Sequence, residues 1–212
     1  MVHVVLLGDS IFDNGIYVPD EPCLSVQLGA YAEQVTLLAV DGDVTVDVMH
    51  QAEGIPASAS HLFVSVGGND ALKSAESLIS ARSGDEVLEI LALTKERFSR
   101  LYRQMVERLQ QTGLPLGVCT IYDRCPFTDE RMGVMAAVGL SVFNDEILRL
   151  ASEEGLAVVD LRVICTERED YSSLSPIEPS AQGGEKIAGV IAQVLEEHDF
   201  GRGECRLYGW EG

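Results

Sequence analysis

The sequence contains few positively charged residues. Lysine and arginine number 15 among 212 residues, against 34 aspartates and glutamates, which gives a formal net charge of −19 at pH 7. A surface of this sign repels the phosphate backbone of nucleic acids and the headgroups of an anionic bilayer. We therefore expect neither a nucleic acid nor a membrane surface as a partner.

Long hydrophobic runs and paired cysteines are also lacking. No apolar run approaches the roughly 18 residues that a membrane-spanning helix needs, and residues 1–7 lack the basic start and the cleavage site of a signal peptide. The five cysteines form no Cys-x-x-Cys pair, which argues against a zinc site and against a disulfide framework. We expect a cytoplasmic protein with reduced thiols and with no metal or cofactor.

Hydrophobic residues are plentiful, and their arrangement indicates an α/β domain. They make up 46% of the chain, and short apolar runs alternate with longer amphipathic stretches, as in βαβ units on a parallel sheet. The pattern predicts helices over about residues 86–110, over about residues 134–154 and from Ser180 onward. It predicts strands over residues 3–7, 35–40, 62–66, 116–120 and 156–160. We expect one domain over residues 1–212, with about residues 199–212 as a surface tail.

Polar, glycine-bearing turns follow the first three expected strands. Glycine, aspartate and asparagine are ordinary turn residues, but ligands of an open parallel sheet bind beyond the carboxyl ends of its strands. Three such turns on consecutive strands should therefore converge on one crevice. The turns are Gly8-Asp9-Ser10, Asp41-Gly42-Asp43 and Gly67-Gly68-Asn69-Asp70.

These turns hold the parts that acyl transfer needs. Ser10 supplies a hydroxyl group in a turn that we expect to lead into a helix, whose amides stabilise nearby negative charge. The Gly42 amide can approach a substrate closely because no side chain intervenes, and Asn69 supplies a side-chain NH2 donor. Donors aimed at one point form an oxyanion hole.

The order and spacing of the motifs resemble those of the SGNH/GDSL hydrolase superfamily. Residues 6–10 resemble its nucleophile block, residues 39–42 its second block and residues 66–70 its third. Residues 144–161 resemble the helix and strand that precede its last block. The resemblance implies a flavodoxin-like three-layer α/β/α fold with five parallel strands in the order 2-1-3-4-5. It also implies esterase or acyl-hydrolase activity on a small ester.

The resemblance further implies a role for each matching residue. Ser10 corresponds to the catalytic nucleophile, and Gly42 and Asn69 correspond to oxyanion donors. The last block of the family reads Asp-x-x-His, whereas this chain has Ser175 at the aspartate position and Glu178 at the histidine position. Both usual triad partners of the nucleophile are therefore replaced.

Three interpretations of Glu178 follow. Glu178 is the working base, with its pKa raised by apolar surroundings; or the site binds a ligand without turning it over; or the base comes from elsewhere, Asp170 or His50 being the candidates. The sequence thus predicts a serine esterase without the usual histidine, with a non-catalytic binding protein on the same fold as the alternative.

Overall fold

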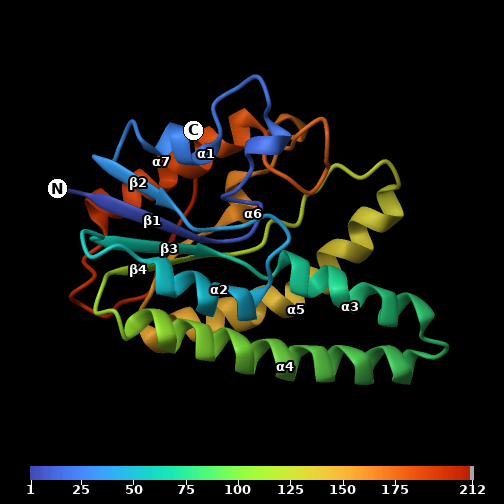
Figure 1. Cartoon of the computed structure of the whole chain (residues 1–212). Coiled ribbons are helices and arrows are strands. Elements are labelled where there is room, and N and C mark those ends of the chain that lie inside the picture. The colour runs from blue at the N-terminus through green and yellow to red at the C-terminus, as the bar shows by residue number, and fades with distance from the viewer. Residues whose placement is uncertain (211–212) are drawn as a thin grey trace.

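The computed structural model describes residues 1–210, apart from the side chain of Glu76, and it contains a parallel sheet between layers of helices (Figure 1). The strand order is β2-β1-β3-β4-β5-β6, and every neighbouring pair is parallel. The strands are β1 (His3–Gly8), β2 (Gln34–Leu37), β3 (His61–Ser65), β4 (Leu116–Cys119), β5 (Ala157–Val159) and β6 (Arg206–Tyr208). The predicted order 2-1-3-4-5 is confirmed for the first five.

Helices cover both faces of the sheet, as the three-layer prediction requires. Helices α1, α6 and α7 cover one face, and helices α2, α4 and α5 cover the other (Figure 1). The helices are α1 (Leu24–Leu28), α2 (Thr45–Gln51), α3 (Gly68–Ser80), α4 (Gly84–Gln110), α5 (Glu130–Glu154), α6 (Leu161–Ile164) and α7 (Ala181–Glu197), with short 3-10 turns η1 (Gly15–Tyr17), η2 (Ala52–Gly54) and η3 (Arg168–Asp170). Within residues 1–210, no helix is both long and apolar enough to cross a bilayer.

Strand β1 shows why the strands lack polar alternation. All six of its residues are buried. Successive side chains of a strand point to opposite faces, so Val4 and Leu6 pack in the core under α1 and α7, while Val5 and Leu7 pack in the core under α2, α4 and α5. A strand between two helical layers needs apolar residues at every position.

The sheet has six strands, so the expectation of five is wrong. Residues 206–208, part of the predicted surface tail, pair with β5 as strand β6. The Tyr208 side chain is 2% exposed, and its carbonyl accepts a hydrogen bond from the Asp160 N–H at 2.8 Å. A three-residue edge strand gives no periodic signal in the sequence. Residues 211–212 of the expected tail lie outside the described residues.

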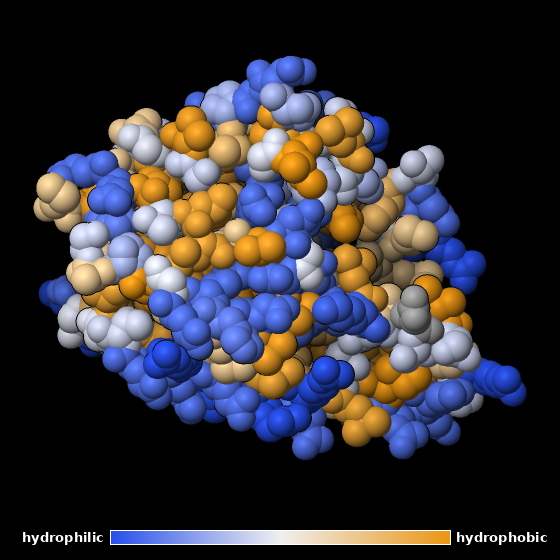
Figure 2. Space-filling model, viewed as in Figure 1, coloured by the Kyte–Doolittle hydropathy of each residue, from blue (hydrophilic) through white to orange (hydrophobic). Residues whose placement is uncertain are grey.

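The helix starts follow local capping chemistry. Ser180, the predicted N-cap of the last helix, accepts a hydrogen bond from the Gly183 N–H through its hydroxyl group at 3.1 Å. Helix α5 begins at Glu130, four residues before the predicted start, because the Asp129 carboxylate accepts from the Arg131 N–H at 2.9 Å and caps it there. On the surface, hydrophobic residues gather in patches among hydrophilic ones, including over the α3 end of the molecule (Figure 2).

Candidate active site

Ser10 lies directly beyond the carboxyl end of β1, in a turn that only glycine permits. Gly8 has a φ of +126°, and a Cβ atom at this position would lie 1.8 Å from the carbonyl oxygen of Ser65 in the neighbouring strand β3. The Asp9 N–H donates to that same oxygen at 3.1 Å. This close approach fixes Ser10 at the sheet edge, where its side chain is 6% exposed.

The turn after Ser10 does not lead directly into a helix, contrary to expectation. The N–H groups of Phe12 and Asp13 both donate to the Asp9 carbonyl at 3.1 Å, which closes a single turn. The next helical element, η1, starts only at Gly15. A helix N-terminus directly after Ser10, which the sequence predicted as a source of charge stabilisation, is therefore not present in this part of the described chain.

The second and third turns are hydrogen-bonded to each other. The Asn69 side-chain amide donates to the Asp43 carbonyl oxygen at 3.0 Å. The Asp70 carboxylate accepts from both the N–H and the hydroxyl group of Thr45, each at 3.0 Å. The turns after β2 and β3 therefore meet at one edge of the sheet.

Gln51, the last residue of α2, joins the first turn to the second. Its side chain accepts from the Gly8 N–H and donates to the Gly8 carbonyl, both at 2.8 Å. It also donates to the Asp43 carboxylate at 2.8 Å. Together with the Asn69 contact, this places all three predicted turns in one connected polar network.

Gly42 and Asn69 keep donor capacity in this network. Gly42 has a φ of +86°, and no atom of the described residues 1–210 lies within 4 Å of the position that its Cβ would take, so the space beside its backbone is open. Asn69 has two N–H donors on its side chain. One of them serves Asp43, which leaves the other for a ligand.

A short antiparallel segment carries Glu178. Tyr171 and Pro179 form an isolated β-bridge, and the Ser172 N–H donates to the Glu178 carbonyl at 2.8 Å. The Tyr122 hydroxyl donates to the neighbouring Ile177 carbonyl at 2.5 Å. The backbone on both sides of the glutamate is therefore held in place.

The Glu178 carboxyl group is buried and has an unused oxygen. It is 5% exposed, and its Oε2 atom has no hydrogen-bond partner among the residues that the structure describes. Burial raises the pKa of this carboxyl to about 7; a hydrogen bond with the Ser10 side chain lowers it, and the charge of Asp41 raises it. Ser10 and Glu178, which the motifs predicted to form one site, therefore lie close enough for the Ser10 side chain to lower the pKa of Glu178.

Asp9, the neighbour of Ser10, is a second buried carboxyl group in the same place. Burial raises its pKa to about 8, a hydrogen bond from the Ile11 N–H lowers it, and the charges of Glu178 and Asp70 raise it. The mutual effect of these charges requires that the first turn, the third turn and the Glu178 segment lie together. The sequence identified Asp9 only as a turn residue.

Comparison with known proteins agrees with this geometry. The family model described as GDSL-like Lipase/Acylhydrolase family matches residues 6–186. The chain belongs to the GDSL-like lipase/acylhydrolase family. Membership supports esterase or acyl-hydrolase activity in general. No curated protein matches the sequence significantly.

Solved structures of two lipases and a carbohydrate acetylesterase share the fold. An extracellular lipase from Streptomyces rimosus has a TM-score of 0.67 at 15% identity, with 94% of this chain and 100% of that chain covered. The lipase Lip_vut3 from a goat rumen metagenome has a TM-score of 0.66 at 21% identity, with the same coverage. Est24, a carbohydrate acetylesterase from Sinorhizobium meliloti, has a TM-score of 0.60 at 11% identity, with 92% and 98% covered. At these identities the similarity shows the fold alone.

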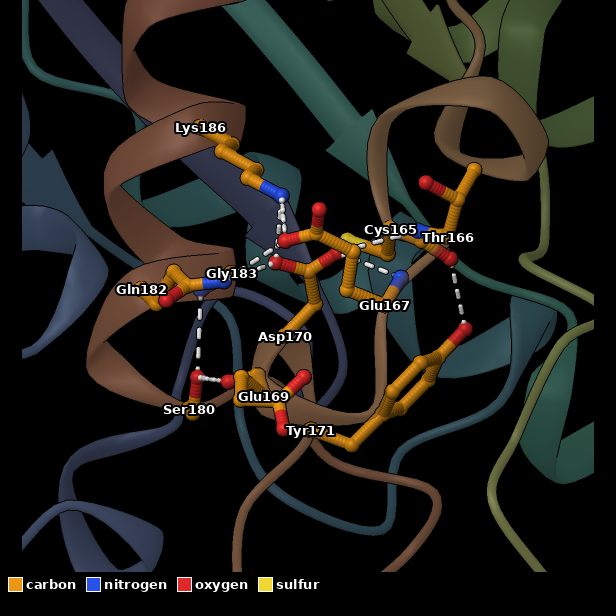
Figure 3. Close-up of polar contacts among 10 residues, drawn as sticks. All are labelled: Cys165, Thr166, Glu167, Glu169, Asp170, Tyr171, Ser180, Gln182, Gly183 and Lys186. Carbon is orange, nitrogen blue, oxygen red and sulfur yellow. Dashed lines mark hydrogen bonds and ion pairs between the residues drawn. The ribbon is translucent and has the colours of Figure 1, made fainter.

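Asp170, one alternative base for this GDSL-like hydrolase, is fully occupied. One carboxylate oxygen accepts from Gln182 at 2.9 Å and pairs with Lys186 at 2.7 Å. The other accepts from the N–H groups of Thr166 and Glu167 at 2.9 and 3.0 Å (Figure 3). Burial raises its pKa, but these hydrogen bonds outweigh burial and hold the pKa below the ordinary value. Such a carboxylate is a poor proton acceptor.

The histidines of this hydrolase have other surroundings. His50, the second alternative base, is exposed in the last turn of α2. His3 is buried with both ring nitrogens within hydrogen-bonding distance of hydroxyl groups. His61 and His198 pack against Phe200. None of these contacts joins a histidine to Ser10.

Sequence reasoning missed two residues that build the site. Gln51 bridges two turns, and the Tyr17 hydroxyl donates to the Asp41 carboxylate at 3.0 Å. No motif marks either residue. Their roles depend on how α2 and η1 pack on the sheet, which a single sequence does not state.

Proposed function

We propose that this GDSL-like protein is a serine esterase that hydrolyses a small ester through an acyl-Ser10 intermediate, with Glu178 as the base. One observation carries the proposal: the buried Glu178 carboxyl lies beside Ser10 with an unpartnered oxygen. A buried polar atom without a partner is costly, and a proton-accepting role gives this atom a function.

The reaction proceeds by two acyl transfers. Glu178 accepts the hydroxyl proton as the Ser10 Oγ atom attacks the ester carbonyl carbon, and the resulting oxyanion accepts hydrogen bonds from the Gly42 N–H and the Asn69 amide. The tetrahedral intermediate then collapses: the bond between the carbonyl carbon and the alcohol oxygen breaks, and the leaving alcohol takes the proton from Glu178. A water molecule then attacks the acyl-serine as Glu178 takes its proton. When this second intermediate collapses, the bond from the acyl carbon to Ser10 Oγ breaks, Oγ takes the proton from Glu178, and the acid is released.

Burial makes a carboxylate suitable for this work. A free glutamate has a pKa of about 4.3 and an imidazole a pKa of about 6.5. The pKa of Glu178 is raised to about 7, so its carboxylate holds a proton about as strongly as the histidine that it replaces. A base is most effective when its pKa lies near the working pH.

The protonation of Asp9 favours a charge on Glu178 alone. With its pKa raised to about 8, Asp9 holds its proton at pH 7 and places no negative charge beside Glu178. The charge of Glu178 raises the pKa of Asp9, so ionisation of Glu178 favours the neutral form of Asp9. The single charge then sits on the residue that contacts Ser10.

Covalent labelling tests the enzyme against its alternative. A fluorophosphonate probe, followed by peptide mapping, should label Ser10 in the wild-type protein and should label nothing in Ser10→Ala. A folded wild-type protein that takes up no label between pH 4 and 9 would instead support the second candidate, a ligand-binding protein. The observation that favours this candidate is the replacement of both triad partners, at Ser175 and Glu178.

A further inference from the structure

An acidic rim borders the candidate active site. It consists of Asp13, of Tyr17 at the end of η1, and of Asp41 in the turn after β2. The Asp41 N–H donates to the Asp13 carboxylate at 3.0 Å, and the Tyr17 hydroxyl donates to the Asp41 carboxylate at 3.0 Å. Asp41 is exposed, and Asp13 and Tyr17 are half-buried, so the rim faces solvent.

The rim lies beside the segment that carries Glu178: the Ser172 hydroxyl donates to the Tyr17 carbonyl at 2.8 Å, and the Ser172 N–H donates to the Glu178 carbonyl at 2.8 Å. Asp41 raises the pKa of Glu178 through its charge. Burial raises the pKa of Tyr17 to about 12, as do its hydrogen bond to Asp41 and the charges of Glu178, Asp41 and Asp13. The charges of the rim and of the Glu178 carboxylate therefore act on each other's surroundings.

The charge of the rim is not neutralised by the contacts it makes. Asp13 and Asp41 accept hydrogen bonds from an uncharged amide and an uncharged phenol. Other acids of the chain, such as Asp160 and Asp170, pair with arginine or lysine. The leading charge effects on Glu178, Asp9 and Tyr17 all come from carboxylates.

Two features beside the rim point to a ligand. Glu178, which is 5% exposed, keeps its Oε2 atom without a partner. Gly42, the residue after Asp41, has open space where a side chain would stand. The backbone of Gly42 is thus open to solvent next to a cluster of carboxylates.

We propose that this site selects esters that carry a positively charged, substituted ammonium group. The cation lies against Asp13 and Asp41 while the ester carbonyl meets Ser10. The inference rests on the proposed function, and it names the class of substrate. Opposite charges attract near a protein surface, and like charges repel, so a carboxylated ester is disfavoured at the same place.

Matched esters test the proposal in the full-length protein. The three substrates are acetylcholine, its uncharged isostere 3,3-dimethylbutyl acetate and the anionic 3-acetoxypropanoate. At low salt, kcat/KM for acetylcholine should exceed that for the neutral isostere by about tenfold, equivalent to about 1.4 kcal/mol. The anion should be the poorest substrate. Salt at about 0.5 M should reduce the preference several-fold, because it screens exposed charges.

Variants locate the source of the preference. The double change Asp13→Asn with Asp41→Asn should abolish most of the preference for the cation. The matched control is Glu89→Gln with Glu96→Gln, which removes the same net charge from exposed positions on α4 and should keep it. The ethyl ester of glycine betaine carries the trimethylammonium group in its acyl part, whereas acetylcholine carries it in its alcohol part. Comparing kcat/KM for these two esters shows which half of the ester the rim recognises.

The outcomes separate the two proposals. Hydrolysis of the neutral ester with no preference for acetylcholine, or a preference that survives the rim variant, overturns the rim and leaves the esterase intact. A protein that hydrolyses none of the esters and takes up no fluorophosphonate fails as an esterase. Equilibrium binding of acetylcholine then decides about the rim: binding that exceeds that of the isostere and is lost in the rim variant supports it, and equal binding overturns it.

Discussion

A glutamate with a pKa of about 4.3 is a weak base at neutral pH, so the position of Glu178 matters as much as its identity. Burial supplies the larger part of its raised pKa. Ser175, at the family's aspartate position, meets the glutamate through backbone: its carbonyl accepts from the Glu178 N–H at 3.4 Å. Orientation therefore comes from the backbone contacts of the segment, because no carboxylate stands at position 175 to hold an imidazole.

Placing the family's aspartate at position 175 and its histidine at position 178 tests whether Ser175 contributes only through its backbone. Glu178→His alone should recover little activity, because a serine cannot orient an imidazole as a carboxylate does. Ser175→Asp combined with Glu178→His should give a more active esterase near pH 8. The measurement is kcat/KM for one neutral ester in both variants, and equal activity of the two would contradict the role assigned to residue 175.

Asp9 should make stability depend on pH. Its pKa is raised from about 3.8 to about 8 on folding, so the folded state binds a proton that the unfolded state releases. This contribution is fully present below about pH 4 and is lost as the pH rises through about 8. Asp9→Asn does not titrate, and its amide oxygen can still accept from the Ile11 N–H.

We therefore expect a flatter stability profile in Asp9→Asn. Urea denaturation at pH 5 and pH 9 should show a smaller loss of unfolding free energy in the variant than in the wild-type protein. Asp20→Asn, a change at an exposed acid, should follow the wild-type profile. Parallel profiles for Asp9→Asn and the wild-type protein would show that Asp9 is ionised at neutral pH.

Among the elements, the segment from η3 to α7 depends on one buried ion pair. The fully buried Asp170 carboxylate pairs with Lys186 of α7 at 2.7 Å. The Asp170 carbonyl accepts from the Ser180 N–H at 2.9 Å, and the Ser180 hydroxyl donates to the Glu169 carbonyl at 2.5 Å (Figure 3). These contacts hold both ends of the segment that carries Glu178.

Lys186→Met should destabilise the fold strongly. Removing one partner of a buried ion pair leaves an uncompensated charge and typically costs about 3–5 kcal/mol of unfolding free energy. Arg202→Met is the control, because Arg202 pairs with Asp199 at the surface, where both side chains are more than 60% exposed and such pairs contribute about 0–1 kcal/mol. Chemical denaturation measures both. Equal, small losses would show that Asp170 does not need Lys186.

Prediction of elements succeeded where a periodic signal was long. The expected strands 3–7 and 62–66 and the helix over 86–110 match β1, β3 and α4 within two residues at each end. Helix α3 was not predicted, because its start coincides with the polar turn at Asn69, and β6 is only three residues long. Elements of this kind depend on tertiary pairing more than on their own pattern.

At the scale of the whole molecule, the parallel topology of the sheet is the reason that the position of the site could be predicted from the sequence. Consecutive strands place their carboxyl ends at one edge, so the turns at Ser10, Gly42 and Asn69 could be predicted to converge. Their hydrogen-bonded network through Gln51 agrees with that prediction. Glu178 as the working base was only one of three interpretations, since the burial that raises its pKa depends on packing by residues distant in the chain.

The pH profile of kcat/KM is the most direct test of Glu178 as the base, because it reports the pKa of the essential base in the free enzyme. With a neutral ester, activity should rise with pH through an apparent pKa near 7, the value to which the pKa of Glu178 is raised. Glu178→Gln should lower kcat by about 10²–10⁴-fold, the usual contribution of a positioned base, while the protein stays folded. An acid limb near pH 4, or wild-type activity in Glu178→Gln, would remove Glu178 from the mechanism.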